Sequence, residues 1–273
     1  MQVVILGSGS PLPDPERAGP STLVRTSAGD VLIDCGRGVL MRAAATGSGA
    51  GSLRALLLTH LHSDHITDLN DVITTRWVLS FSPSPLHVFG PPGTAAVVHG
   101  VESMLDLDVG YRLAHHDELT WRPSTSVTEI DSGHVLDEGA VRITSARTDH
   151  TPVHHSLAFR IDDGDASVVV AGDTVPCAGL DLLCKDVDLL VHTVVRRDLI
   201  EAFDLPRLTD VLDYHSSVSD AAATAARGGV RTLLMTHLVP APTPGTENAW
   251  LDQAAASFSG GVLLGSDLLC VDV

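Results

Sequence analysis

Three histidines and one aspartate fall within six residues in the segment Thr59-His-Leu-His-Ser-Asp-His65. This segment follows the run Leu53–Leu58, which is apolar except for Arg54 and has the length of a buried strand. A loop after a strand can direct several side chains to one point, whereas a continuous strand or helix cannot. Neutral imidazole and carboxylate are the usual ligands of zinc, manganese and iron. We therefore interpret the segment as a metal-binding loop, and its candidate ligands are His60, His62, Asp64 and His65.

Three more residues of ligand type follow other predicted strands. These are His150 after Val141–Ser145, Asp173 after Val168–Ala171, and His237 after Leu233–Met235. Open α/β sheets place their functional sites beyond such strand ends. Taken singly, each is as well explained as a capping aspartate or a structural histidine. Together with the histidine loop they supply the seven groups that a two-metal site needs.

Short apolar runs and turns alternate along the chain and would form the elements that position these residues. The other predicted strands are Val3–Leu6, Leu23–Thr26, Val31–Ile33, Leu86–Phe89, Leu157–Ile161 and Val187–Val191. Helices are predicted over Gly38–Ala45, from about Thr94 to Met104, and over Asp220–Ala226. Residues 105–126 show no clear pattern. Two β-rich halves with helices between the strands predict an α/β sandwich in one domain over residues 1–273.

The composition restricts the partners and the compartment. The net charge is −17 and the chain contains a single lysine. Binding to a phosphate backbone draws on clustered Lys and Arg, so we expect no nucleic-acid partner. No apolar run approaches the ~20 residues that cross a bilayer, and the N-terminus lacks a basic signal segment. We therefore predict a cytoplasmic protein, and we interpret its four scattered cysteines as buried thiols.

The order HxHxDH…H…D…H resembles the metallo-β-lactamase superfamily. More narrowly, nearly the whole chain resembles the ribonuclease Z and arylsulfatase-like branch. The motifs that carry the resemblance are Leu6-Gly-Ser-Gly-Ser10, Ile33-Asp-Cys-Gly36, Leu58-Thr-His-Leu-His-Ser-Asp-His65, Gly90-Pro-Pro-Gly93, Ala171-Gly-Asp-Thr174 and Tyr214-His-Ser-Ser217.

This resemblance implies a four-layer αββα sandwich with two divalent metal ions at one edge, between its sheets. Zinc is the expected ion, with manganese and iron as alternatives, and a homodimer is the expected assembly. The first ion would be held by His60, His62 and His150, the second by Asp64, His65 and His237, and Asp173 would bridge them. His215 matches a histidine that in this branch faces the scissile group.

Such a site would hydrolyse its substrate with a metal-bridged hydroxide formed near neutral pH. Asp64 would also orient that hydroxide, and His215 would stabilise developing charge or protonate the leaving group. Asp34 and Thr59 are candidates for fixing the ligands, or simply for stabilising a turn. His154 and His155 either line the pocket or belong to a surface loop.

Two departures from the branch bear on the substrate. Ribonuclease Z enzymes carry a tRNA-binding arm where this chain has only the turn Asp162-Asp-Gly-Asp165. This chain also has His192-Thr193 where the family shows a His-Glu pair. With the acidic charge, these departures favour a small ester-type substrate, namely a phosphodiester, a sulfate ester, or a carboxylic ester or lactone. The alternatives are a ribonuclease Z-type tRNA 3′-endonuclease and an iron-dependent oxidoreductase with a separate flavin partner.

Overall fold

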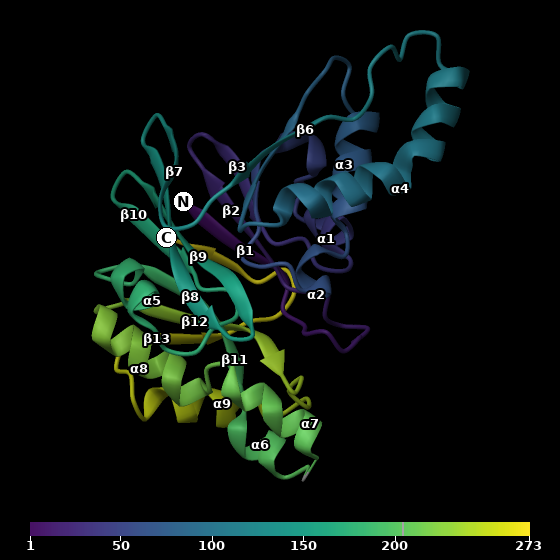
Figure 1. Cartoon of the computed structure of the whole chain (residues 1–273). Coiled ribbons are helices and arrows are strands. Elements are labelled where there is room, and N and C mark those ends of the chain that lie inside the picture. Colours follow the sequence, from purple (N-terminus) through teal and green to yellow (C-terminus); the bar gives the residue numbers. More distant parts are fainter. Residues whose placement is uncertain (204) are drawn as a thin grey trace.

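In the computed structural model, which describes residues 1–203 and 205–273, two seven-stranded sheets face each other (Figure 1). Across the first sheet the order is β14 (Cys270–Asp272), β1 (Gln2–Gly7), β2 (Ser21–Thr26), β3 (Gly29–Ile33), β4 (Leu53–Leu57), β5 (Leu86–Gly90) and β6 (Thr125–Glu129). Across the second it is β13 (Gly261–Leu264), β12 (Thr232–Val239), β11 (Leu189–Val195), β10 (Ala166–Val170), β9 (Val153–Asp163), β8 (Val141–His150) and β7 (Gly133–Glu138).

Helices cover the outer face of each sheet. The first sheet and the loops at its edge carry α1 (Val39–Ala45), α2 (Ser63–Ile66), α3 (Leu69–Val78) and α4 (Thr94–His115), with the 3₁₀ turn η1 (Ala50–Ser52). The second carries α5 (Ala178–Leu183), α8 (Val218–Gly228) and α9 (Glu247–Ala255). Between β11 and α8 lie α6 (Arg197–Glu201), α7 (Pro206–Thr209) and the 3₁₀ turn η2 (Asp210–Asp213).

Successive side chains of a strand point to opposite faces of its sheet, and this alternation explains the four layers. On β1, Val3 and Ile5 point into the core between the sheets, whereas Val4 and Leu6 point into the core beneath the helices. Both faces of such a strand are buried, which is why its sequence is continuously apolar. A third core lies between the second sheet and its helices. The four-layer αββα sandwich expected from the sequence is confirmed.

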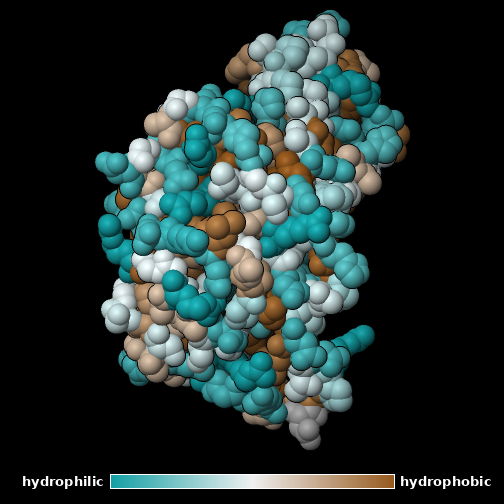
Figure 2. Space-filling model, turned by 60° about the vertical axis from the view of Figure 1, so that its left-hand side comes forward, coloured by the Kyte–Doolittle hydropathy of each residue, from teal (hydrophilic) through white to brown (hydrophobic). Residues whose placement is uncertain are grey.

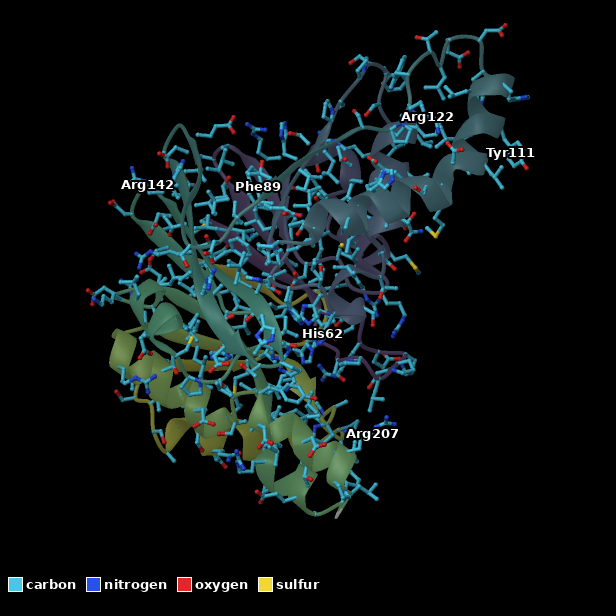
Figure 3. All side chains as sticks on the ribbon, viewed as in Figure 1. His62, Phe89, Tyr111, Arg122, Arg142 and Arg207 are labelled. Carbon is cyan, nitrogen blue, oxygen red and sulfur yellow. The ribbon has the colours of Figure 1, made fainter. Side chains whose placement is uncertain are left out.

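Strand direction brings the site residues to one edge. β10, β11 and β12 are parallel, and β8 runs in the same direction because β9 is antiparallel to both β8 and β10. The carboxyl ends of these strands therefore meet at one edge of the second sheet. The loop after β4 reaches the same region from the first sheet, as Figure 3 shows for His62.

Several elements are longer than the sequence suggested. The predicted helix Thr94–Met104 continues to His115, so about half of the irregular segment 105–126 is helical and its last two residues begin β6. The alternating Leu105-Asp-Leu-Asp-Val109 hid the helix, because alternation is the signature of a strand. β8 extends as far as His150, and β12 continues through His237, whose φ is 47°.

The prediction of four buried cysteines is wrong in part. Cys35 and Cys184 are buried, but Cys177 is half-buried and Cys270 is exposed on the edge strand β14. Among the described residues, no helix combines the length and apolar character needed to cross a membrane. On the face shown in Figure 2, hydrophobic residues form small, separate areas among hydrophilic ones.

Candidate metal centre

Asp34 holds the histidine loop in place. The backbone N–H of Thr59 donates to Oδ1 of Asp34 (2.8 Å), and the Thr59 hydroxyl donates to Oδ2 (2.8 Å). Nδ1 of His65 lies 2.7 Å from the same Oδ2. Asp34 itself has a left-handed φ of 57° and is buried. Asp34 and Thr59 thus fix the loop and the ring of His65, as one of the two sequence interpretations expected.

Three imidazoles converge at the first of two ligand groups. Nε2 of His60 lies 3.0 Å from Nδ1 of His62, and Nε2 of His150 lies 3.3 Å from that same Nδ1. Nitrogens about 2.0–2.1 Å from one tetrahedral zinc ion are separated by roughly 3.3 Å. The three nitrogens therefore have the spacing of ligands around a single ion.

The second group contains Asp64, His65 and His237. Oδ2 of Asp64 lies 3.3 Å from Nε2 of His237 and 3.7 Å from Nε2 of His65. These atoms also lie close enough together to hold one metal ion.

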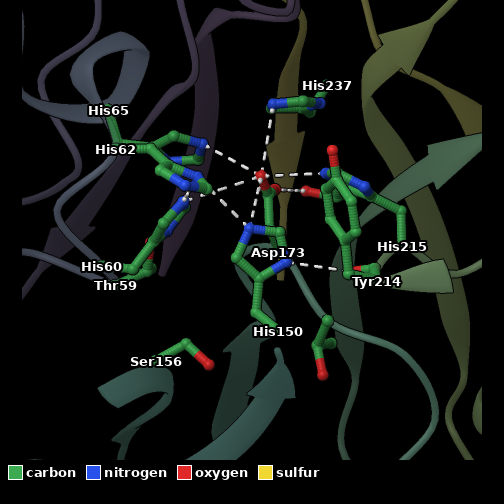
Figure 4. Close-up of polar contacts among 12 residues, drawn as sticks. Thr59, His60, His62, His65, His150, Ser156, Asp173, Tyr214, His215 and His237 are labelled. Carbon is green, nitrogen blue, oxygen red and sulfur yellow. Dashed lines mark hydrogen bonds and ion pairs between the residues drawn. The ribbon is translucent and has the colours of Figure 1, made fainter. Parts of the chain in front are cut away.

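Asp173 lies between the two groups and faces both with one oxygen atom (Figure 4). Its Oδ2 is 3.8 Å and 3.9 Å from Nε2 of His60 and His150, and 3.3 Å and 3.5 Å from Nε2 of His65 and His237. Gly172 precedes it with a φ of 62°, and a Cβ there would lie 2.8 Å from Cβ of Thr59. Only glycine allows this turn to pass so close to the histidine loop.

The remaining ring nitrogens have partners that orient the rings. Nδ1 of His150 lies 2.8 Å from the backbone carbonyl of Tyr214, and Nδ1 of His60 lies 3.0 Å from the Thr59 hydroxyl. Each contact directs Nε2 toward the centre. Nε2 of His65 is buried and has no hydrogen-bond partner in the described part of the chain. An orphaned nitrogen aimed at two carboxylates is the condition that a metal ion would relieve.

The protonation states suit cation binding. Burial lowers the pKa of His150 to about 4 and holds that of His60 well below its usual value, so both imidazoles keep a free lone pair. Burial opposes ionisation of Asp173, but His237 and His65 nevertheless hold its pKa well below the usual range. His60 and His150 are thus neutral donors beside an ionised carboxylate. Burial lowers the pKa of His65, but Asp173 and Asp34 outweigh this effect and raise it, so a divalent ion would displace a proton from that ring. The residues present therefore fit a pair of divalent ions.

His215 lies beside these groups without belonging to either. Its Nε2 is 3.3 Å from Oδ2 of Asp173, and its Nδ1 is 2.9 Å from the backbone carbonyl of Val211. Burial lowers the pKa of His215, but Asp173 and the Val211 carbonyl outweigh this effect and raise it. The ring is therefore positioned to donate from Nε2.

Two contacts in the site had not been expected from the sequence. The Thr193 hydroxyl donates to Oδ1 of Asp173 (2.9 Å), which leaves Oδ2 facing the two groups. The Val211 carbonyl lies 2.9 Å from Nδ1 of His215 and orients its ring. A backbone carbonyl leaves no signal in the sequence, whereas Thr193 could have been noticed as a hydroxyl at the end of an apolar strand.

A cavity of about 620 Å³ opens beside the centre. His62, Asp64, Asp173, His215 and His237 line it, together with apolar residues of α6, α7 and the loop between β1 and β2. His154 and His155 do not line this cavity and are exposed on β9. Of the two interpretations of these histidines, the surface position is correct.

The comparisons with known proteins agree with the site. Residues 30–238 match the Beta-lactamase superfamily domain. A ribonuclease Z of Mycobacterium avium is 55% identical, with 100% of this chain and 98% of the relative covered. A ribonuclease Z of Mycobacterium bovis is 54% identical over the same shares.

Solved structures share the fold over the whole length. The metallo-β-lactamase fold protein YhfI from Bacillus subtilis superposes with a TM-score of 0.74 at 24% identity, covering 99% of this chain and 98% of that one. The short form of human tRNase Z gives a TM-score of 0.73 at 21% identity, covering 100% and 99%. At these identities the likeness concerns the fold alone. The domain match, the near full-length relatives and the clustered ligand groups together show that this chain belongs to the β-lactamase superfamily, in its ribonuclease Z branch, as a metal-dependent hydrolase acting on ester bonds.

Proposed function

We propose that the protein is a two-metal phosphodiesterase that cleaves RNA near its 3′ end, as a ribonuclease Z does. The observation that supports this most strongly is the 52–55% identity to proteins named ribonuclease Z over the entire chain. The sequence alone had favoured a small ester and no nucleic-acid partner. The names of the relatives disagree with that expectation, so RNA becomes the first candidate.

The seven groups would hold two divalent ions, with zinc as the first choice. His60, His62 and His150 would take one ion, Asp64, His65 and His237 the other, and Oδ2 of Asp173 would contact both. When bound, the ions lower the pKa of water and act as Lewis acids toward a phosphoryl oxygen. Asp64 faces the cavity and would accept a hydrogen bond from the attacking water, which fixes its direction of approach.

His215 would act on the leaving group. It lines the same cavity as Asp64, and its Nδ1 is held by the Val211 carbonyl. Nε2, which lies 3.3 Å from Oδ2 of Asp173, is therefore the nitrogen that would donate to the substrate. A protonated ring there donates its proton to the oxygen that departs when the P–O bond breaks.

A small phosphodiester is the second candidate substrate, because β9 and β10 are joined by a tight turn. Asp163 and Ala166 are paired across this hairpin, which leaves no room for an arm between these strands. The net charge of −17 also favours a small substrate over a long phosphate backbone. These features favour a substrate whose contacts stay within the cavity.

Cleavage assays with the zinc-loaded protein would test the proposal. A short 3′-extended RNA and bis(p-nitrophenyl) phosphate should both be hydrolysed, and the RNA should give the higher kcat/KM. Hydrolysis of the small diester without any RNA cleavage would select the second candidate. Failure on both, with two ions bound, would refute phosphodiesterase activity.

The assembly, the ion and the compartment belong to the same proposal. We expect zinc in the purified protein, a homodimer and a cytoplasmic location. Elemental analysis and light scattering after size-exclusion chromatography would check the first two, and cell fractionation the third.

A further inference from the structure

One wall of the cavity is built by a segment that has no part in the metal centre. Between β11 and η2 the chain forms α6 and α7. Ile200 of α6, Phe203 of the connection between the two helices, and Arg207 and Leu208 of α7 line the cavity, and we call this surface the α6–α7 wall. The loop after β1 also lines the cavity. The side chains on these walls have to contact whatever part of the substrate lies beyond the reacting bond.

This wall has a core of its own, separate from the three cores of the sandwich. Val195, Ile200 and Leu212 are buried together, and partly buried Leu208 and Val211 pack against them. The start of α6 is fixed as well, because the Arg196 guanidinium lies 5.4 Å from the centre of the buried Trp250 ring. Arg196 also forms a two-point ion pair with Asp198 (2.8 and 2.6 Å). The small core and the contacts of Arg196 thus hold the wall in a fixed position.

Two exposed side chains on this wall, Phe203 and Arg207, are aromatic and cationic, whereas their neighbours Ile200 and Leu208 are aliphatic. Phe203 lines the cavity with 52% of its surface exposed. Tyr214, the other Phe or Tyr of the lining, instead packs its ring 4.7 Å from that of His215 and 5.3 Å from that of His150. Arg207 is a cation in a strongly acidic chain and also lines the cavity. In Figure 3 it lies below His62.

An aromatic face and a cation within one cavity are complementary to a nucleotide. Bases stack on aromatic side chains without requiring a particular sequence, and arginine binds phosphate oxygens through its planar donors. The cavity volume of about 620 Å³ lies within the range of pockets that enclose small ligands.

From this juxtaposition we infer that the α6–α7 wall is a nucleotide subsite. Phe203 stacks on the base of a nucleotide next to the scissile phosphodiester, and Arg207 contacts its phosphate. This inference rests on the proposed function, because it assigns part of the RNA substrate to a defined wall of the same cavity. It makes Phe203 a specificity-determining residue for substrates that carry a base.

Titration calorimetry on the full-length, zinc-loaded protein separates the base from the phosphate. The probes are adenosine 5′-monophosphate and ribose 5-phosphate, which differ only in the base. The wild type should bind the nucleotide about 5–150-fold more tightly, the usual range for stacking of one base on an aromatic side chain. Phe203→Ala should remove this difference and Phe203→Trp should retain it. Arg207→Gln should weaken both probes alike.

Leu199→Ala is the matched control, because Leu199 is an exposed apolar residue of α6 that does not line the cavity. It should bind both probes as the wild type does. Equal binding of the two probes by the wild type would overturn the inference, as would a Phe203→Ala variant that keeps the preference while retaining its metals and its Tm. A base preference that depends on Phe203, in a protein that cleaves neither RNA nor the small diester, would support the subsite and refute the proposed function.

Discussion

A single oxygen atom, Oδ2 of Asp173, faces ring nitrogens from both ligand groups at 3.3–3.9 Å. Replacing this carboxylate should therefore affect two ions at once. Asp173→Ala should lose more than one equivalent of metal, measured by elemental analysis after dialysis. Asp149→Ala is a suitable control, because Asp149 is an exposed carboxylate next to His150. Two equivalents retained by Asp173→Ala would contradict the bridging role.

His215 contacts Asp173 but belongs to neither ligand group, so its removal should separate catalysis from metal binding. His215→Ala should keep both ions, and kcat should fall about 10²–10⁴-fold, the usual effect of a general acid, with a smaller change in KM. The loss should shrink for substrates with acidic leaving groups, which need no proton. Loss of an ion from this variant would mean that His215 is a ligand.

At the residue scale, the sequence predicted which side chains converge but only part of what holds them, namely Asp34 and Thr59. The histidine loop has a strong signal, whereas His150, Asp173 and His237 became candidates only together with that loop. Their partners include backbone carbonyls, such as that of Tyr214, which any residue carries. Phe203 gave no signal either, because a phenylalanine in a short loop segment is usually assigned to the core.

Among the elements, the loop between β1 and β2 depends on one buried carboxylate. Asp267 accepts hydrogen bonds from the Ser8 N–H and hydroxyl, the Ala18 N–H and Nε of Arg42, all at 2.8–2.9 Å. Residues 9–14 and Arg17 of this loop line the cavity. Asp267 thus positions a wall of the site from the opposite end of the chain.

Asp267→Ala should destabilise the protein by about 3 kcal/mol, because it leaves two backbone N–H groups and a guanidinium without an acceptor. KM should rise as the loop loses its fixed position, while metal content stays at the wild-type level. Urea unfolding and steady-state kinetics would measure both effects. Asp272→Ala, which removes an exposed carboxylate near the C-terminus, should change neither. An unchanged free energy of unfolding in Asp267→Ala would show that the loop is held by other contacts.

Element types were easier to predict than element lengths. β8 and β12 extend past their apolar runs because pairing with β9 and β11 continues through polar residues such as Thr148 and Thr236. The outer part of α4 has few buried residues, so no apolar stripe marked it as a helix. Its Asp108–Arg112 ion pair, spaced i, i+4, adds local support.

For the molecule as a whole, the charge determines how RNA binding should respond to salt. Among the described residues, the cavity lining includes two arginines, Arg17 and Arg207, and the chain has one lysine. Two phosphate contacts on a single strand give a slope of about −1.4 for log K against log salt. The kcat/KM for a 3′-extended RNA should therefore fall less than about tenfold between about 50 and 200 mM KCl. A drop of about 10³-fold would reveal phosphate contacts over a much larger surface.

The two ligand groups contain residues from both sheets, so bound ions would cross-link the two halves of the sandwich. His60, His62, Asp64 and His65 follow β4 of the first sheet, whereas His150, Asp173 and His237 come from the second. Bound ions would then be linked thermodynamically to the cohesion of the two sheets. One site saturated at a hundredfold excess over its Kd adds about 2.7 kcal/mol to the free energy of unfolding. Chelation should accordingly lower Tm in proportion to the logarithm of free zinc, and hydrogen exchange should speed up first where the sheets meet at this edge.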